Sequence, residues 1–460
     1  MSKVFVIGLD AAPPKLVFED FKGELPNLAE MMDHGVYGPL ESCDPPITIP
    51  AWAAMATSRN PGALGLYGFR HRKRGSYAGF YVASSLSVKE ETVWDILSRR
   101  GLKSCVIGVP PSYPPKPLNG LLVSCFITPD ATKEYTYPPS LKPEVERLVG
   151  EYVFDVKFRT EERDKLLREL YEMTEKRFKL VKHLLTAKKW DFFMFVEIGV
   201  DRIQHAFWKY YDETHKRHVP NHPYKDAIKE YYKRLDAEIG RILKLLDEDT
   251  AVIVVSDHGA KRMDGALCIN EWLIQEGWMK LKEEPKRVVD LEEAKVDWGK
   301  TKAWGWGGYY ARVFLNVKGR EPNGVIKPGD FEEERENLRQ ALMEIRGPSG
   351  RRMDMKVYKP EEIYPVCRGD YPDLMVYFDD LYWRSAGTLG HGLVHLPEND
   401  KGPDDAVHAR EGIFIVYDKA GTLGKREGKA NVLDVAPTVL SLMGIPIPSG
   451  FEGKTVEGVS

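Results

Sequence analysis

The chain has 460 residues, which is enough for one large domain with an insertion or for two domains. Lys and Arg number 66 against 69 Asp and Glu, so the formal net charge at pH 7 is −3. This near-neutral balance argues against a dedicated nucleic-acid-binding or membrane-binding surface. It carries no information on the oligomeric state.

The cysteines and the N-terminus bear on the cellular compartment. The five cysteines are scattered, without a CxxC pair, at Cys43, Cys105, Cys125, Cys268 and Cys367. This pattern indicates neither a zinc ribbon nor a disulfide framework, but buried thiols in a reducing compartment. The run Val4–Ile7 is too short for a signal-peptide core, and no apolar stretch approaches the length of a membrane span. We therefore expect a cytoplasmic protein.

Short apolar runs rich in β-branched residues alternate with helical patterns along the chain. The predicted buried strands are Val4–Leu9, Ser104–Val109, Phe192–Ile198, Ala251–Ser256 and, near the end, Gly412–Tyr417. The predicted helices are Thr92–Arg100, Glu161–Lys188, Tyr224–Leu246 and, near the end, Asp434–Met443. This alternation predicts an α/β fold in which helices cover both faces of a mostly parallel sheet.

The alternation breaks after Gly259, where the chain becomes richer in Trp, Gly, Pro and charge. We expect a loop at 304–308, an exposed edge strand at 309–317, a helix at 330–346 and a short extended segment at 355–358. These signals predict an inserted α+β cap subdomain at 261–403. The core is then expected to comprise 1–260 and 404–460.

Three segments beginning with predicted strands lead into an aspartate: Asp10, Asp201 and Asp257. In an open α/β sheet ligands bind beyond the carboxyl ends of the strands, so these carboxylates are expected at one edge. They would repel one another there unless cations neutralised them. A single such aspartate is usually a helix N-cap, but three together, with histidines beside two of them, favour a metal site.

Two of these aspartates have a histidine at a useful spacing. Asp201 and His205 are four residues apart, so in a helix both side chains lie on one face. An N-capping aspartate beside a surface histidine is the alternative. Asp257 is followed directly by His258 and then by Gly259, which permits a tight turn. Such oxygen and nitrogen donors suit zinc, and also manganese or iron.

A proline-rich segment, 45–55, contains a threonine that could carry chemistry. Pro50 suits the first turn of a helix, so Thr48 is expected at or just before the helix N-terminus. The backbone donors and the dipole favour anions there. A capping hydroxyl is the usual role of such a threonine, whereas a hydroxyl beside a metal would be a nucleophile toward phosphorus.

The ordered set of these residues resembles the alkaline phosphatase superfamily, and in particular its type I phosphodiesterase and nucleotide pyrophosphatase family. The set comprises Asp10, Thr48 in its proline-rich turn, Asp201 with His205, Asp257 with His258, and a late histidine. The C-terminal segment 434–440 with Gly444-Ile445-Pro446 resembles the superfamily as well, whereas residues 265–385 match no pattern that we can place. The resemblance implies an alkaline phosphatase-like core and a small-molecule phosphate ester as substrate.

The resemblance also implies two divalent metal ions, with zinc favoured over manganese or iron. Asp201, His205 and a late histidine would hold one ion. Asp10, Thr48, Asp257 and His258 would hold the other. The late histidine is expected to be His408, which precedes a predicted buried strand, rather than His391 or His395. The implied reaction is a double in-line displacement through a phospho-threonine at Thr48.

The chain departs from the family in one region. An asparagine that helps to hold phosphate in the nucleotide pyrophosphatases is replaced here by Phe69, followed by a cationic run from Arg70 to Arg74. That run is either a solvated loop or a substitute for the asparagine, with Arg70 or His71 as the hydrogen-bond donor to the phosphate. The aromatic residues Trp304, Trp306, Tyr309 and Tyr310 also allow two interpretations. They are either part of the subdomain core or a stacking surface for a flat leaving group.

Three other functions fit the sequence less well. A phosphoglycerate mutase of the same superfamily would need a nucleophilic serine followed directly by the large insertion. A phosphomonoesterase remains an alternative within the same chemistry. A metal-stabilised binding protein without turnover would lack the nucleophile or a ligand, and the sequence has candidates for all of them. We therefore favour a two-metal phosphodiesterase.

Overall fold

The computed structural model describes residues 3–77 and 79–459. The chain divides into two compact units, each of which combines segments that are distant in sequence. Unit 1 comprises Met1–Gly68, Ala83–Ala260 and His408–Ser460, and unit 2 comprises Phe69–Val82 and Lys261–Val407. The division differs from the expected one in two respects: Phe69–Val82 groups with the inserted segment, and that segment extends to Val407 instead of residue 403.

Unit 1 is built around a ten-stranded sheet. Its strands are β1 (Val4–Leu9), β2 (Val36–Glu41), β5 (Ser104–Ile107), β6 (Gly120–Val123), β7 (Thr136–Tyr137), β8 (Phe192–Glu197), β9 (Ala251–Val255), β19 (Glu411–Asp418), β20 (Arg426–Glu427) and β21 (Ala430–Asn431). Their order is β20-β2-β19-β9-β1-β8-β5-β6-β7, with β21 beside β2. From β9 to β6 neighbouring strands are parallel, whereas β19 is antiparallel to both of its neighbours.

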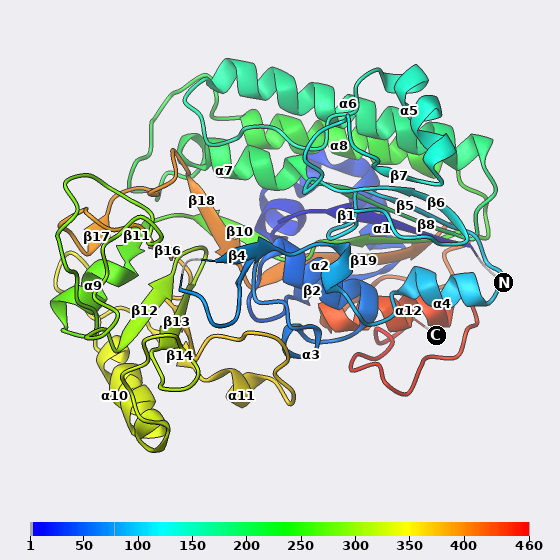
Figure 1. Ribbon diagram of the computed structural model, residues 1–460. Helices are drawn as coiled ribbons and strands as arrows, with labels where there is room; N and C mark the ends of the chain where they lie inside the picture. Colours follow the sequence, from blue (N-terminus) through cyan, green and yellow to red (C-terminus); the bar gives the residue numbers. More distant parts are fainter. Residues whose placement is uncertain (1–2, 78, 460) are drawn as a thin grey trace. The chain divides into compact units, whose positions relative to one another are not determined.

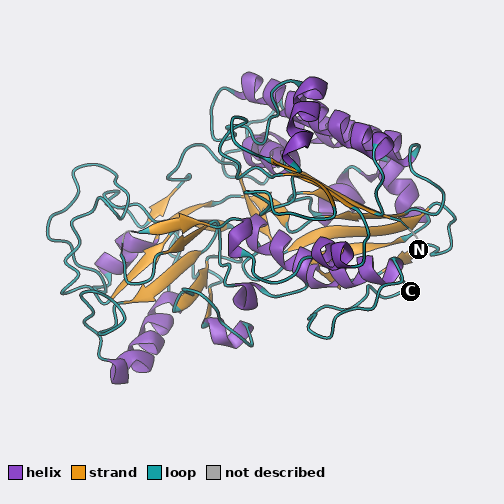
Figure 2. Ribbon diagram, turned by 45° about the vertical axis from the view of Figure 1, so that its right-hand side comes forward, coloured by secondary structure: helices purple, strands orange, loops and turns teal. Residues whose placement is uncertain are grey.

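Helices cover both faces of this sheet. They are α1 (Pro26–Asp33), α2 (Thr48–Thr57), α3 (Pro61–Leu64), α4 (Val93–Arg99), α5 (Lys142–Val149), α6 (Arg163–Ala187), α7 (Gly199–Tyr211), α8 (Ala227–Leu243) and α12 (Val435–Leu442). The short helical turns are η1 (Lys15–Asp20), η2 (Lys22–Glu24), η3 (Ser85–Ser87), η4 (Pro139–Leu141) and η6 (Val432–Asp434). Figure 1 shows α6 and α8 on one face and α2, α4 and α12 on the other, and Figure 2 shows the sheet between these layers. The predicted α/β sandwich is confirmed.

Helix α2 packs very closely on strand β1. A Cβ atom at Gly8 would lie 2.5 Å from the Cη2 atom of Trp52, so only glycine permits this approach. Every residue of α2 and of β1 is buried, as expected for a parallel strand covered on both faces. The packing brings the N-terminal turn of α2 to the carboxyl end of the sheet.

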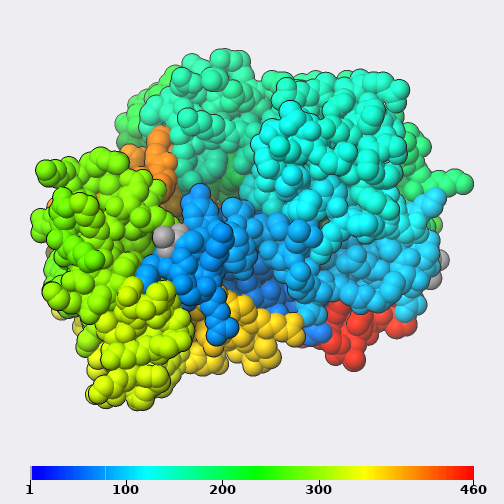
Figure 3. Space-filling model, in the orientation of Figure 1, coloured from blue at the N-terminus to red at the C-terminus, as the bar shows by residue number. Residues whose placement is uncertain are grey.

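Unit 2 contains three small sheets. Their strands are β3 (Arg70–Arg72) with β4 (Phe80–Val82); β11 (Gly265–Cys268) with β16 (Trp383–Ala386) and β17 (His395–Leu396); and β12 (Ala303–Trp306), β13 (Ala311–Leu315), β14 (Lys356–Tyr358) and β15 (Leu374–Tyr377). The helical segments are α9 (Ile269–Gln275), η5 (Pro328–Asp330), α10 (Phe331–Met343) and α11 (Pro360–Ile363). The chain passes between the units at Gly68–Phe69, at Val82–Ala83, within β10 (Gly259–Arg262) and within β18 (Ala406–Ala409). All three residues of β4 are exposed, and blue chain from this part of the sequence reaches the surface in Figure 3.

Two predictions for unit 2 are wrong. The expected loop at 304–308 begins inside strand β12, and the expected edge strand is β13, which lies between β12 and β15 with all five residues buried. The polar residue in this strand, Arg312, explains the error. Its guanidinium lies 5.3 Å from the centre of the Trp306 ring and donates a hydrogen bond to the carbonyl of Arg70. A buried arginine with such partners is compatible with a central strand.

All five cysteines have free thiols, and four of them are buried, as expected; Cys367 is half-buried. Among residues 3–77 and 79–459, no helix combines the length and the hydrophobicity needed to cross a membrane. The cytoplasmic location stays a prediction.

Candidate metal centre

Three adjacent parallel strands deliver acidic residues to one edge of the sheet in unit 1. Gly8 of β1 pairs with Val196 of β8 and with Val255 of β9, so the three strands end nearly level. Asp10 follows β1 directly, and Asp257 lies two residues beyond β9. Asp201 lies in the first turn of α7, which follows β8. The carboxyl edge of the sheet therefore gathers the three predicted aspartates.

The first cluster consists of Asp10, Asp257 and His258, all fully buried, with one ligand atom of each within 4.8 Å of the others. The Nε2 atom of His258 lies 3.3 Å from Asp257 Oδ2 and 3.8 Å from Asp10 Oδ1. The other carboxylate oxygens accept hydrogen bonds, Asp10 Oδ2 from the Trp52 indole at 2.7 Å and Asp257 Oδ1 from the Ala11 amide at 3.3 Å. Within the described residues, Asp10 Oδ1 and Asp257 Oδ2 accept no hydrogen bond. Each carboxylate thus directs one oxygen at a common point.

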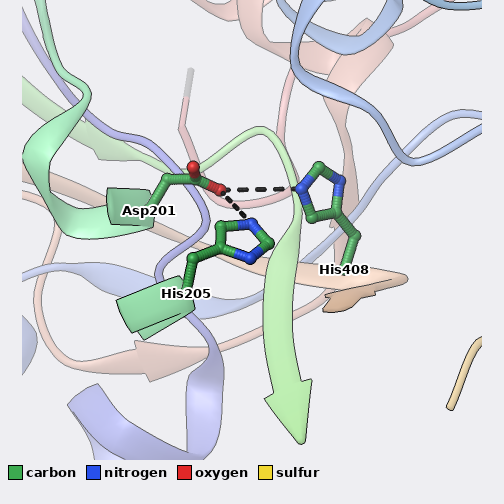
Figure 4. A group of neighbouring side chains, drawn as sticks. All are labelled: Asp201, His205 and His408. Atoms are coloured by element: carbon green, nitrogen blue, oxygen red, sulfur yellow. Dashed lines mark ion pairs between the residues drawn. The ribbon is translucent and has the colours of Figure 1, made fainter. Parts of the chain in front are cut away.

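The second cluster consists of Asp201, His205 and His408, shown in Figure 4. Asp201 Oδ1 lies 3.2 Å from His205 Nε2 and 3.5 Å from His408 Nε2. Asp201 and His205 stand one turn apart on α7, whereas His408 comes from β18. The three side chains are buried and converge on one point, which is the arrangement a tetrahedral cation site requires.

Backbone carbonyls fix the tautomers of two of these histidines. His258 Nδ1 lies 3.0 Å from the Gly259 carbonyl oxygen, and His408 Nδ1 lies 2.9 Å from that of Pro46. A carbonyl can only accept, so each Nδ1 carries a proton, and in the neutral ring each Nε2 keeps a lone pair that faces the same point as the carboxylates. Histidines that bind metals are commonly oriented in this way.

The electrostatics of the first cluster are those of a site built for a cation. Burial raises the pKa of Asp10 well above its usual value, and the charge of Asp201 raises it further. Burial and the neighbouring Asp10 do the same for the pKa of Asp257. Burial and His408 lower the pKa of His258 well below its usual value. Two buried acids beside a neutral imidazole can both ionise only if positive charge is supplied.

The second cluster has a different balance. Burial opposes ionisation of Asp201, but His205 and Arg202 outweigh it and hold the pKa of Asp201 well below its usual value. Burial lowers the pKa of His408, although Asp201 opposes this shift. A neutral His408 beside an ionised Asp201 is the protonation state in which both can bind a metal.

The two clusters adjoin each other, with Thr48 beside them. The rings of His258 and His408 stack with their centres 3.8 Å apart. Thr48, the first residue of α2, is buried, and its Oγ1 lies 3.3 Å from His258 Nε2. One turn later on α2, Trp52 holds Asp10. The structure therefore brings together all seven residues expected at the metals.

The residues expected at the phosphate pocket belong to unit 2, whereas both clusters lie in unit 1. Phe69 is half-buried, and Arg70 is exposed with its guanidinium 4.8 Å from the centre of the Phe80 ring. His71 is only 1% exposed, and burial, aided by Arg312, lowers its pKa to about 3. A neutral His71 supplies no positive charge for a phosphate.

The remaining candidates also lie in unit 2. His391 Nε2 lies 2.7 Å from the Thr388 hydroxyl, and His395 pairs with Leu267 in the sheet. Trp304 is fully buried, and Trp306 is 8% exposed, both in the hydrophobic core of this unit. Tyr309 and Tyr310 are buried too, so the four aromatic residues form core rather than an open stacking surface.

Sequence reasoning missed two side chains that hydrogen-bond to the ligands. Trp52 holds Asp10, and Arg202 contacts Asp201. The available signals were positional, since Trp52 lies one helical turn after Thr48 and Arg202 directly follows Asp201. A tryptophan and an arginine at such positions could equally have been packing and surface residues.

Comparison of the sequence with protein families gives a family, and comparison with solved structures gives a fold. The sequence model of the family described as type I phosphodiesterase / nucleotide pyrophosphatase matches residues 4–404. Curated protein sequences give no significant match.

Solved structures with the same architecture cover nearly the whole chain. Human ectonucleotide pyrophosphatase/phosphodiesterase 5 aligns with a TM-score of 0.56 at 12% identity, over 97% of this chain and 96% of that one. The murine protein, in an inactive variant with a threonine replaced by alanine and in complex with AMP, aligns with a TM-score of 0.56 at 14% identity and the same coverage. The murine protein in a further structure gives 0.55 and 14%, again with the same coverage. At such identities the likeness shows the fold alone.

Proposed function

The chain belongs to the type I phosphodiesterase / nucleotide pyrophosphatase family, and from this membership we propose that it hydrolyses phosphodiester or pyrophosphate bonds with two divalent cations. The observation that carries the proposal is the pair of adjoining buried clusters with the Thr48 hydroxyl beside them. Family membership supports hydrolysis of phosphoric esters. The threonine and the cations are our assignment.

The two clusters fit divalent cations. Asp10, Asp257 and His258 would hold one ion beside Thr48, and Asp201, His205 and His408 would hold the other. The mixed oxygen and nitrogen donors suit zinc best, with manganese and iron as alternatives. When bound, the cations would supply the positive charge that stabilises the crowded, anionic phosphoryl group in the transition state.

The side chains then have distinct tasks. Thr48 Oγ1 attacks phosphorus, so that an Oγ–P bond forms, the bond to the leaving oxygen breaks, and the hydroxyl proton ends on the leaving group. Water hydrolyses the phospho-threonine and returns a proton to Oγ1. Trp52 keeps Asp10 turned toward the site, and the Pro46 carbonyl keeps His408 in its tautomer. Burial of Thr48 holds the nucleophile in place. Its position at the N-terminus of α2 puts backbone N–H donors near a bound anion.

The substrate class follows from the family and from one neighbour. The murine structure holds AMP, which makes nucleotides and dinucleotide diesters the first compounds to test here. Binding of the base cannot be assigned to Trp304 or Trp306, because both lie in the core of unit 2.

Replacement of Thr48 by alanine tests the proposal. Hydrolysis of bis-p-nitrophenyl phosphate is expected to fall about 10³-fold or more, because the nucleophile is lost. Thr57→Ala is the matched control, since Thr57 ends the same helix and only donates to the Ala53 carbonyl at 2.7 Å. Undiminished hydrolysis by Thr48→Ala would overturn the nucleophile assignment. A panel of nucleotide diesters, monoesters and phospholipid head groups, run on the wild type, then ranks the substrates.

A further inference from the structure

Arg202 is a buried cation in direct contact with one of the clusters. Its Nη1 contacts Asp201 Oδ2. Its Nε and Nη2 donate to the two carboxylate oxygens of Asp155 at 2.7 and 2.8 Å. The guanidinium lies 4.5 Å from the centre of the Phe158 ring and 5.3 Å from that of Phe126. The arginine is thus fixed on every side, and Asp201 Oδ2 is fixed with it.

Among the described residues, no cationic side chain is in hydrogen-bond contact with the carboxylates of the first cluster, although the charge of Arg202 also acts on Asp10 from farther away. Asp10 is held by the neutral indole of Trp52 and Asp257 by the backbone amide of Ala11. Its two aspartates carry two negative charges toward a cation. The second cluster has the single charge of Asp201, and Arg202, which is shared with Asp155, offsets part of that charge at contact distance. A divalent cation is therefore attracted much less strongly to the second cluster than to the first.

We propose that Arg202 is a positioning residue that makes the second cluster the weaker of two cation sites. By occupying Asp201 Oδ2 it leaves only Oδ1 to face a cation, together with His205 and His408. A cation held there would be bound by one carboxylate oxygen and two imidazoles, which would leave a position for an oxygen of the substrate. The inference rests on the proposed function, because it takes both clusters as cation sites.

The first experiment titrates the metal-free protein with zinc in competition with a chromogenic chelator. The wild type is expected to bind two ions with dissociation constants at least tenfold apart. Asp201→Asn should abolish the weaker binding step, and Asp10→Asn the tighter one. Loss of the tighter step in Asp201→Asn would overturn the proposal.

The second experiment changes Arg202 itself. Arg202→Met removes the charge but leaves an unbranched apolar side chain between the two phenylalanine rings. Zinc should then bind the weaker site at least tenfold more tightly, while kcat falls at least tenfold because Asp201 is free to turn and use both oxygens. Arg202→Lys keeps the charge and should restore the weak affinity. An unchanged or weakened site in Arg202→Met would contradict the proposal.

Asp155→Asn separates this role from a structural one, and it serves if Arg202→Met fails to fold. The Asp155 side chain is 28% exposed, so the change is mild. It leaves the charge of Arg202 without its counter-charge, so zinc should bind the second site several-fold more weakly, with the first site unchanged. Equal weakening of both sites would indicate a general loss of structure and would overturn the inference.

These measurements also distinguish a failure of the inference from a failure of the proposed function on which it rests. A wild type that binds no zinc at either cluster would remove the proposed function. Two bound ions and Thr48-dependent hydrolysis, with affinities that do not respond to Arg202→Met, would remove only the role of Arg202.

Discussion

Arg72 of unit 2 and the first cluster of unit 1 both bury charged side chains, but with opposite kinds of partner. In unit 2, Arg72 is buried against the rings of Trp304 and Phe314, with ring centres 5.4 and 4.6 Å from its guanidinium. It donates to Asp370 at 2.7 and 2.8 Å and to Glu321 at 2.6 Å. In unit 1, Asp10 and Asp257 are buried beside each other and a neutral histidine, and their pKa values are raised well above the usual range.

This difference distinguishes buried charges that stabilise the fold from buried charges that serve a binding site. A buried charge that meets its counter-charge within the chain ties segments together, as Arg72 ties β3 to residues 321 and 370. Buried acids without such a partner cost free energy unless something from outside neutralises them. The presence of two such acids, Asp10 and Asp257, beyond the ends of β1 and β9 indicates a binding site for a cation.

Of the changes that test this difference, removal of metal should have the largest effect on the stability of the protein. An ion present at a thousand times its dissociation constant stabilises the folded state by about 4 kcal/mol per site. Thermal unfolding of the zinc-loaded protein should therefore occur at a much higher temperature than after treatment with a chelator. Asp10→Asn, which removes one site, should show a smaller shift. The same unfolding temperature with and without metal would contradict the account of unit 1.

The matched charges of unit 2 can be broken by Arg72→Met. Because Glu321 and Asp370 would lose their buried partner, the free energy of unfolding should fall by about 3–5 kcal/mol. Arg74→Met is the control, since Arg74 is exposed in the same segment and its loss should cost under about 0.5 kcal/mol. Chemical denaturation of both variants measures the difference. A loss of bound metal in Arg72→Met without a loss of stability would reverse the roles that we assign.

A smaller effect should come from His71, a buried base in unit 2. Its pKa is lowered from 6.5 to about 3 by burial. Between these values the unfolded chain binds a proton that the folded chain does not, so this contribution to stability is present at pH 7 and is lost as the pH falls. From pH 7 to pH 5 the loss is about 2 kcal/mol.

His71→Phe keeps the ring and removes the titration. The variant should therefore lose less stability than the wild type over this pH range, as denaturation at pH 7 and pH 5 would show. Parallel losses in the two proteins would mean that His71 is accessible to protons in the folded state.

The sequence allowed the acidic residues of the site to be found because the strands that carry them are apolar and end abruptly. Asp10 and Asp257 follow apolar runs rich in β-branched residues, and parallel strands bring such ends to one edge. The reversed direction of β19 could not be read, because a strand has the same pattern in either direction. The choice of His408 depended on the strand that follows it, and the structure puts that residue beside Asp201.

The burial of two arginines could not be predicted from the sequence, because it depends on partners that are distant along the chain. Arg72 lies in a run of basic residues that reads as a solvated loop, and its buried state depends on Asp370, 298 residues away. The same holds for Arg312, whose contacts with Trp306 and the carbonyl of Arg70 permit a central strand. The family resemblance, by contrast, was readable from the ordered ligands alone, and the family match over residues 4–404 confirms it.

The central claim is that unit 1 holds two cations in two separate clusters, and a metal count tests it most directly. Wild type, Asp10→Asn and Asp201→Asn would be dialysed to equilibrium against excess zinc, and the bound metal measured per chain. The account predicts two ions in the wild type and one in each variant. Fewer than one ion in the wild type, or the same content in all three proteins, would contradict it.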